Sequence, residues 1–276
     1  MKNDIKNRFV AYGRDNENIR SIFYRKSMTD DEFVDLYIVP REVIIGKLEE
    51  DLGKLFEDIF LINRIKSSFQ VEKDRQNYTI LEAFRASGVK ISQSIIAEDL
   101  LGDFLGQAPS DFEFIYNKGD MPSLMVNEAF TYDLPKEYEF RATVDSFFAK
   151  AVETSLFLRQ KNAIGALMTM DKLRQELIKM INFYIIDKYN GLRDMGKNGR
   201  DISHSLSQDL REDFELTFPT NELLDIYTCL FKACGLFRKI GMKEANDLSY
   251  EYNREADVKA LKLLRKNYKK LESILR

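Results

Sequence analysis

The hydrophobic period changes once along this chain of 276 residues, and that change limits the possible folds more than any other feature. Up to about residue 125, short apolar runs rich in β-branched and aromatic side chains are separated by turns, which is typical of strands. From about Lys136 onward, apolar residues recur at three- and four-residue spacing with few breakers, which is typical of helices. The pattern predicts an α+β protein, with a mixed β-sheet domain flanked by helices in residues 1–125 and an all-helical bundle in residues 126–276.

Within the first half, the strand-like runs cover residues 21–24, 33–39, 58–65, 78–86, 89–96 and 112–116. Gly88 lies between two of them, and because glycine tolerates a positive φ, we expect an antiparallel hairpin there. Residues 42–56 carry an apolar stripe at helical spacing and predict a helix.

The second half is predicted to be helical from residue 136 to a stop at Gly191, again over 220–241, and again over 244–275. Thr220 is a candidate N-cap for the middle helix. Residues 191–208 are polar and glycine-rich, so we expect a loop. The domain boundary is placed between Pro122 and Pro135, before helical periodicity begins.

Charge and cysteine content exclude several functional classes. The 42 basic and 45 acidic residues leave a net charge of −3, which argues against a protein that mainly neutralises a nucleic-acid backbone. The sequence has neither an apolar signal segment nor a run of roughly 20 apolar residues, so we expect a cytoplasmic protein without a membrane partner. Cys229 and Cys234 lie in an apolar helical run, which favours reduced, buried thiols.

The common enzyme motifs are missing from the sequence. It contains no GxGxxG, no GxxxxGK[ST] and no GxSxG. His204 is the only histidine, which excludes histidine-rich metal sites, and its polar surroundings are typical of a surface residue.

Four blocks in the second half carry a resemblance to a known family. They read ALMTMDKLRQELIKMINF, DMGKNGRDI, LFKACGLFRKI and ANDLSYEY, and together with their order over residues 135–268 they resemble the C-terminal helical domain of streptomycin (aminoglycoside) 6-adenylyltransferases. The most specific elements are Arg174-x-Glu176-Leu177-x-x-Met180-Ile181, Gly196-Lys197-Asn198 and Leu236-Phe237-Arg238.

The resemblance implies a fold and a chemistry. That family belongs to the polymerase-β-like nucleotidyltransferases, which transfer AMP from ATP to a hydroxyl of a small-molecule aminoglycoside. A Gly-Ser pair after the first strand holds a phosphate, and three carboxylates on neighbouring strands bind Mg²⁺. Mg²⁺ needs such oxygen ligands and offsets the charge that develops on the phosphates.

Laid against this plan, the chain departs from the pattern at the phosphate loop and at the third carboxylate. Lys26 replaces the glycine before Ser27, which adds a Cβ where the backbone must approach a phosphate. Ser92 stands at the position of the third carboxylate, and the nearest acids, Glu98 and Asp99, are at least six residues farther along the chain.

The paired carboxylates of the family are also incomplete. If Asp35 corresponds to the first of the pair, Tyr37 replaces the second; if Asp35 corresponds to the second, Phe33 replaces the first. Asp35 is therefore the one candidate for both catalysis and metal binding, and a hydrogen-bonded aspartate at the end of a strand is the alternative.

Other site candidates come from the loop blocks. Ser27, Lys197 and Arg200 are candidates for binding the phosphates of ATP, with a solvated loop as the alternative for the two cations. Arg174 and Glu176 are interpreted as residues of a helical solvent face.

Three functions remain open at this stage. The first is a degenerate homologue that binds a nucleotide or another small ligand between its two domains without adenylyl transfer. The second is an active aminoglycoside nucleotidyltransferase with an unrecognised carboxylate set, and the third is an interaction module without a ligand. The missing motif residues favour the first, because lost metal ligands remove transition-state stabilisation.

Overall fold

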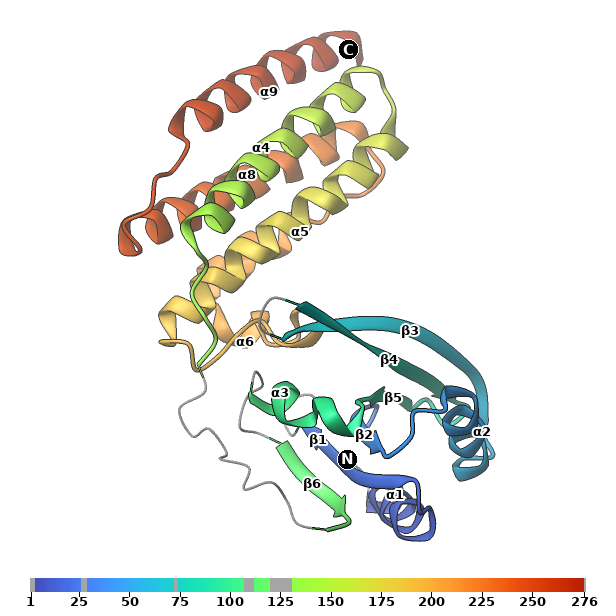
Figure 1. The fold of residues 1–276 in the computed structure, drawn as a ribbon. Coiled ribbons are helices and arrows are strands. Elements are labelled where there is room, and N and C mark those ends of the chain that lie inside the picture. Colours follow the sequence, from blue (N-terminus) through green and yellow to red (C-terminus); the bar gives the residue numbers. More distant parts are fainter. Residues whose placement is uncertain (1–2, 26–28, 72–73, 107–111, 120–130, 276) are drawn as a thin grey trace. The chain divides into compact units, whose positions relative to one another are not determined.

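The structure is a computed structural model that describes residues 3–25, 29–71, 74–106, 112–119 and 131–275. The chain forms two compact units, Met1–Phe130 and Thr131–Arg276 (Figure 1). Ser27, predicted to contact a phosphate, and the neighbouring Lys26 lie outside the described residues.

The first unit is built on a six-stranded sheet with the strand order β3-β4-β5-β2-β1-β6. Only β2 and β5 pair in parallel, and the other neighbours are antiparallel, so the sheet is mixed as predicted. The strands are β1 Ile19–Arg25, β2 Phe33–Pro40, β3 Ile59–Val71, β4 Asp74–Arg85, β5 Lys90–Ile95 and β6 Phe112–Asn117.

Each face of the sheet packs against different helices. Helices α1 (Asn3–Asp15) and α2 (Ile45–Leu55) supply buried residues to one apolar core. The 3-10 turn η2 (Glu98–Leu100) and helix α3 (Leu101–Gly106) pack against aromatic side chains that belong to the other face. Alternating side chains of β2 take part in both cores, because successive residues of a strand point to opposite faces.

The second unit contains no strand among its described residues. In it, α4 packs against α5 and α9, and α5 packs against α8. The rings of Phe147 on α4 and Phe237 on α8 stack at 3.8 Å in the middle of the core. The helical elements are α4 Glu137–Arg159, α5 Ala163–Lys188, η3 Lys197–Gly199, α6 Ile202–Ser205, α7 Gln208–Glu215, α8 Leu223–Asp247 and α9 Arg254–Leu275.

The fold class is confirmed, and so is the hairpin between β4 and β5. Gly88 has a φ of +82° at its turn. Both cysteines lie unpaired on α8, and burial raises the pKa of the Cys234 thiol to about 12. His204 is exposed.

Several details of the sequence prediction were wrong. The sequence did not predict α1, whose buried stripe consists of Ile5, Phe9 and Gly13. The strands β3 and β4 continue beyond the predicted ends, because their antiparallel ladder extends through the polar pairs from Lys66–Thr79 to Val71–Asp74.

Thr220 is not the N-cap of α8. The helix begins at Leu223 after Glu222, while the N–H and hydroxyl of Thr220 both donate to the Asp225 carboxylate. The helix also continues to Asp247, past the predicted end, before a break in which Ser249 has a φ of +57°.

Candidate functional site

The parallel pairing of β2 with β5 places Asp35 directly beside Ser92. In the next pairing, β4 places Glu82 opposite Ser92. Because paired residues of neighbouring strands point to the same face of a sheet, these three residues form one line across it. We call this line the Asp35 row; it comprises Asp35, Ser92 and Glu82.

Asp35 and Ser92 are both buried, with exposed fractions of 8% and 5%. The backbone of Asp35 is held by Thr29, whose hydroxyl accepts a hydrogen bond from the Asp35 N–H at 3.2 Å and is within 3.3 Å of the Asp35 carbonyl oxygen. The row therefore has a fixed backbone at its Asp35 end. Next to that aspartate it offers a hydroxyl where the family plan expects a carboxylate.

Glu82, the second carboxylate of the Asp35 row, is engaged elsewhere. It forms an ion pair with Lys90, and Asn63 is 3.5 Å from its other oxygen. Two strand spacings separate the Asp35 and Glu82 backbones, about 10 Å. Among the described residues, no group of three carboxylate, histidine or cysteine side chains converges at this row.

Tyr37 occupies the position two residues after Asp35 on the same face, and it is packed among aromatic rings. It stacks on Phe23 with 5.0 Å between centroids and 4° between planes. The rings of Phe104 and Phe112 lie 5.3 and 5.4 Å away. Tyr37 is partly buried, so a carboxylate at this position would lose aromatic packing and lie beside apolar rings, which is unfavourable for an ion.

The alternative alignment places Phe33 in the pair instead. Its side chain is 54% exposed, so that position holds an apolar residue in contact with water. In either alignment Asp35 has no carboxylate neighbour on its own strand. Mg²⁺ prefers near-octahedral oxygen coordination with one or two carboxylates plus phosphates and water. Asp35 beside a serine hydroxyl, with Glu82 paired to Lys90, leaves this row short of the three carboxylates that the family plan requires.

The described residues do contain one convergent acidic group, and it lies in the helical unit. Oxygen atoms of Asp187 on α5 and of Glu244 and Asp247 on α8 lie within 4.8 Å of one another. Lys243 Nζ lies 2.5 Å from Asp247, 3.4 Å from Glu244 and 3.9 Å from Asp187. The lysine ammonium therefore already serves as the cation of this group.

Glu244 is the buried member of that group, with an exposed fraction of 0%. Burial raises the pKa of its carboxyl to about 7, above the usual 4.5, and Lys243 opposes this rise. Sequence reasoning missed the group, since Asp187 lies far from α8 along the chain. The spacing of Lys243 and Asp247 by one helical turn was the available signal.

Comparison with known proteins gives the family. The model of the family described as streptomycin adenylyltransferase matches residues 4–267. The chain belongs to this family. The resemblance found in the sequence is thereby confirmed, and it extends through the sheet unit as well as the helical one. No curated protein matches the sequence.

Two solved structures are similar to this member of the streptomycin adenylyltransferase family. An aminoglycoside 6-adenyltransferase from Bacillus subtilis has 17% identity and a TM-score of 0.50, over 97% of this chain and 99% of that one. A nucleotidyltransferase-like protein from Exiguobacterium sibiricum has 11% identity and a TM-score of 0.38, over 89% of this chain and 79% of that one. The first likeness supports the nucleotidyltransferase-like fold.

The helical blocks that carried the resemblance to the adenylyltransferase family lie partly in the structural core. Phe237 stacks on Phe147, and Glu176 accepts a hydrogen bond from Ser146 of α4 at 2.8 Å. Arg174 pairs with Asp171, and its guanidinium carbon lies 4.5 Å from the centre of the Phe218 ring. These contacts give Arg174 and Glu176 packing partners rather than a purely solvated face.

The Gly-Lys-Asn block of the family forms a tight turn. Gly196, Asn198 and Gly199 all have a positive φ, and the Gly199 N–H donates to the Gly196 carbonyl at 3.2 Å. A Cβ at Gly196 would come within 2.4 Å of the Asp201 carboxylate, so this turn requires glycine. Arg200 follows the turn with an exposed side chain, while the side chain of Lys197 lies outside the described part of the structure.

The three predicted site residues that lie among the described residues fall in different units. Asp35 belongs to the sheet unit, and Lys197 and Arg200 belong to the helical unit. No helix in the described part of this family member is long and apolar enough to cross a membrane.

Substitution of Tyr37 tests whether position 37 is a packing site. Tyr37→Asp should lower the free energy of unfolding by about 1–3 kcal/mol, because it removes the aromatic packing of a partly buried side chain and places a charge beside apolar rings. Tyr37→Phe should cost about 1 kcal/mol or less. Urea unfolding followed by circular dichroism measures both, and Phe33→Asp on the same face is the exposed control. A Tyr37→Asp protein as stable as wild type would contradict this packing role.

The raised pKa of Glu244 predicts a pH-dependent stability. A carboxyl whose pKa is higher in the folded protein stabilises the fold below its unfolded pKa, and this contribution is lost as pH rises through about 7. Between pH 5 and pH 8, wild type should lose up to about 3 kcal/mol relative to Glu244→Gln.

The measurement for Glu244 is urea unfolding across that pH range. Asp247→Asn is the matched control, because Asp247 is exposed and its pKa is lowered by Lys243. Parallel pH profiles for wild type and Glu244→Gln would show that Glu244 titrates normally.

Proposed function

We propose that this chain is a catalytically degenerate member of the streptomycin adenylyltransferase family, one that binds a small ligand without transferring AMP. The observation that carries the proposal is the Asp35 row, where a single buried aspartate faces Ser92 and is followed by a tyrosine packed among rings. Adenylyl transfer in this family depends on carboxylates that hold Mg²⁺ at the phosphates. The family plan assigns three carboxylates to that role, whereas here Asp35 lies beside a serine hydroxyl and Glu82 is paired with Lys90.

The residues that replace the family's other carboxylates also support a protein without adenylyl transfer. The carboxylate expected at position 37 is replaced by a tyrosine that packs against Phe23, Phe104 and Phe112. The replacement therefore involves several neighbouring side chains. Restoring a carboxylate at position 37 alone would leave it within an apolar cluster. We therefore interpret the loss of the family's carboxylates as a change in how this face of the sheet is packed. Asp35 then has a structural role, with its N–H bonded to the Thr29 hydroxyl.

A nucleotide remains a candidate ligand of the degenerate protein. Lys197 lies within a turn rich in positive φ angles and Arg200 follows it, and charge-assisted hydrogen bonds from such cations suit phosphate oxygens. Ser27, which lies outside the described residues, remains a predicted neutral hydroxyl donor. ATP bound in this way would depend on the cationic side chains, and Mg²⁺ would contribute little.

An active aminoglycoside adenylyltransferase is the second candidate function, and Glu82 is the observation that favours it. This carboxylate lies on the same row and the same face as Asp35. Release from Lys90 would be needed before Glu82 could serve a metal. A resistance function against aminoglycosides belongs to this second candidate. An interaction module without a ligand is the third.

Turnover distinguishes the first candidate from the second. Purified protein with ATP, Mg²⁺ and streptomycin should release no pyrophosphate above the rate without enzyme, since the row has Asp35 and a Glu82 that is paired with Lys90, in place of the family's set of three. The coupled pyrophosphate assay should give the same background for Asp35→Ala and Glu82→Gln. Turnover in wild type that disappears in either variant would overturn the degenerate assignment.

Nucleotide binding is tested by isothermal titration with ATP, with and without Mg²⁺. Lys197→Ala or Arg200→Ala should weaken binding roughly ten-fold, the value of one charge-assisted hydrogen bond, and Mg²⁺ should change the affinity little. Lys172→Ala, on the exposed side of α5, is the control. Undetectable ATP binding to wild type would favour the interaction module.

A further inference from the structure

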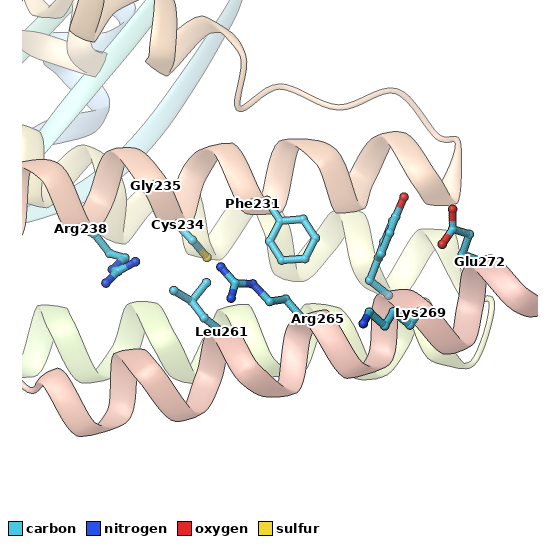
Figure 2. Close-up of a pocket in the computed structure, with 9 residues that line it drawn as sticks. Phe231, Cys234, Gly235, Arg238, Leu261, Arg265, Lys269 and Glu272 are labelled. Carbon is cyan, nitrogen blue, oxygen red and sulfur yellow. The ribbon is translucent and has the colours of Figure 1, made fainter.

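A groove runs between α8 and α9 on the helical unit, with a volume of about 510 Å³ (Figure 2). That volume is within the range of about 300–1,000 Å³ that is typical of small-molecule sites. Figure 2 shows the Arg265 side chain reaching from α9 into the space between the two helices. The groove lies wholly within one unit, and the proposed function assigns it no role.

The groove is cationic. Its lining includes Arg238 from α8 and Arg265 and Lys269 from α9, against one carboxylate, Glu272. Arg238 Nε donates to the buried Asp257 carboxylate at 2.7 Å, so its charge is compensated. Among the described residues, Arg265 and Lys269 have no hydrogen bond or ion pair. With Glu272 counted, the lining keeps a net positive charge, and Arg265 and Lys269 lie about one helical turn apart on one side of the groove.

The groove also has an apolar wall. The ring of Phe231 on α8 lies edge-on to that of Tyr268 on α9, with 5.9 Å between centroids and 75° between planes. The thiol of Cys234, which also lines the groove, is buried and neutral at physiological pH. A ligand that fills this space would place a flat apolar part against the rings, because aromatic edges and faces pack well together.

Gly235 keeps the α8 side of the groove free of a side chain. It lies in the interior of a long helix, where glycine is unfavourable relative to alanine. A Cβ at this position would meet no atom within 4 Å, so helix packing does not require glycine. The missing side chain leaves room in the groove instead.

We propose that the groove between α8 and α9 binds a small organic phosphate monoester that carries an aromatic ring. The ring packs against Phe231 and Tyr268, and the phosphate dianion is held by Arg265 and Lys269. A phosphate offers three oxygens that can accept from both Arg265 and Lys269, more than a carboxylate offers, and Arg and Lys both bind phosphate oxygens through charge-assisted hydrogen bonds.

Phenyl phosphate is the probe, titrated into the full-length protein by isothermal calorimetry. Arg265→Ala should weaken binding about ten-fold, and inorganic phosphate should bind wild type at least about ten-fold more weakly because it lacks the ring. Lys266→Ala is the matched control: Lys266 is an exposed cation on the same helix, outside the groove lining, and its loss should leave the affinity unchanged.

Gly235→Leu tests the space itself. The leucine should fill the groove and abolish phenyl phosphate binding while leaving the melting temperature unchanged or higher, since leucine favours helix. The proposal is overturned if wild type shows no binding up to about 10 mM, a weak-affinity limit. It is equally overturned if Arg265→Ala keeps wild-type affinity, or if inorganic phosphate and phenyl phosphate bind alike.

Discussion

Aromatic packing around Tyr37 limits which metal ligands one face of the sheet can carry. Tyr37 stacks on Phe23, and Phe104 of α3 and Phe112 of β6 pack against the same ring. The part of β2 that follows Asp35 therefore belongs to a hydrophobic core. A divalent cation at this face would need carboxylates in the space that these rings fill. The chemistry proposed for the whole chain depends on this contact, because β2 carries no second carboxylate besides Asp35, and Ser92 is its neighbour on β5.

The helical unit keeps the family's blocks largely for structural reasons. Phe237 of the Leu-Phe-Arg block stacks in the core, and Arg238 next to it is paired with the buried Asp257. Such contacts can be retained in a protein that has lost catalysis, since they stabilise the fold itself. Family membership and a degenerate site are therefore physically compatible.

The sequence predicted the architecture well because periodicity is set by burial. Apolar residues follow strand spacing in β2 and helical spacing in α5 and α8, because the buried faces of these elements have those periods. The family resemblance implied that the strands of Asp35 and Ser92 are neighbours, and β2 and β5 do pair, with Asp35 beside Ser92.

Features that depend on tertiary contacts were not predictable. Glu82 is brought to the Asp35 row by β4–β5 pairing, and Asp187 meets Glu244 only because α5 packs against α8. Helix α1 was missed because few residues mark its buried stripe. No local sequence pattern contains these long-range partners.

Paramagnetic broadening by Mn²⁺ tests the central claim most directly, because Mn²⁺ replaces Mg²⁺ at oxygen sites. Amide signals of Asp35 and Ser92 are followed by NMR during a Mn²⁺ titration in the presence of ATP. We predict no selective, saturable broadening of these two signals relative to the rest of the sheet unit. Selective broadening that saturates and disappears in Asp35→Ala would contradict the account, because it would place a functional metal at the Asp35 row.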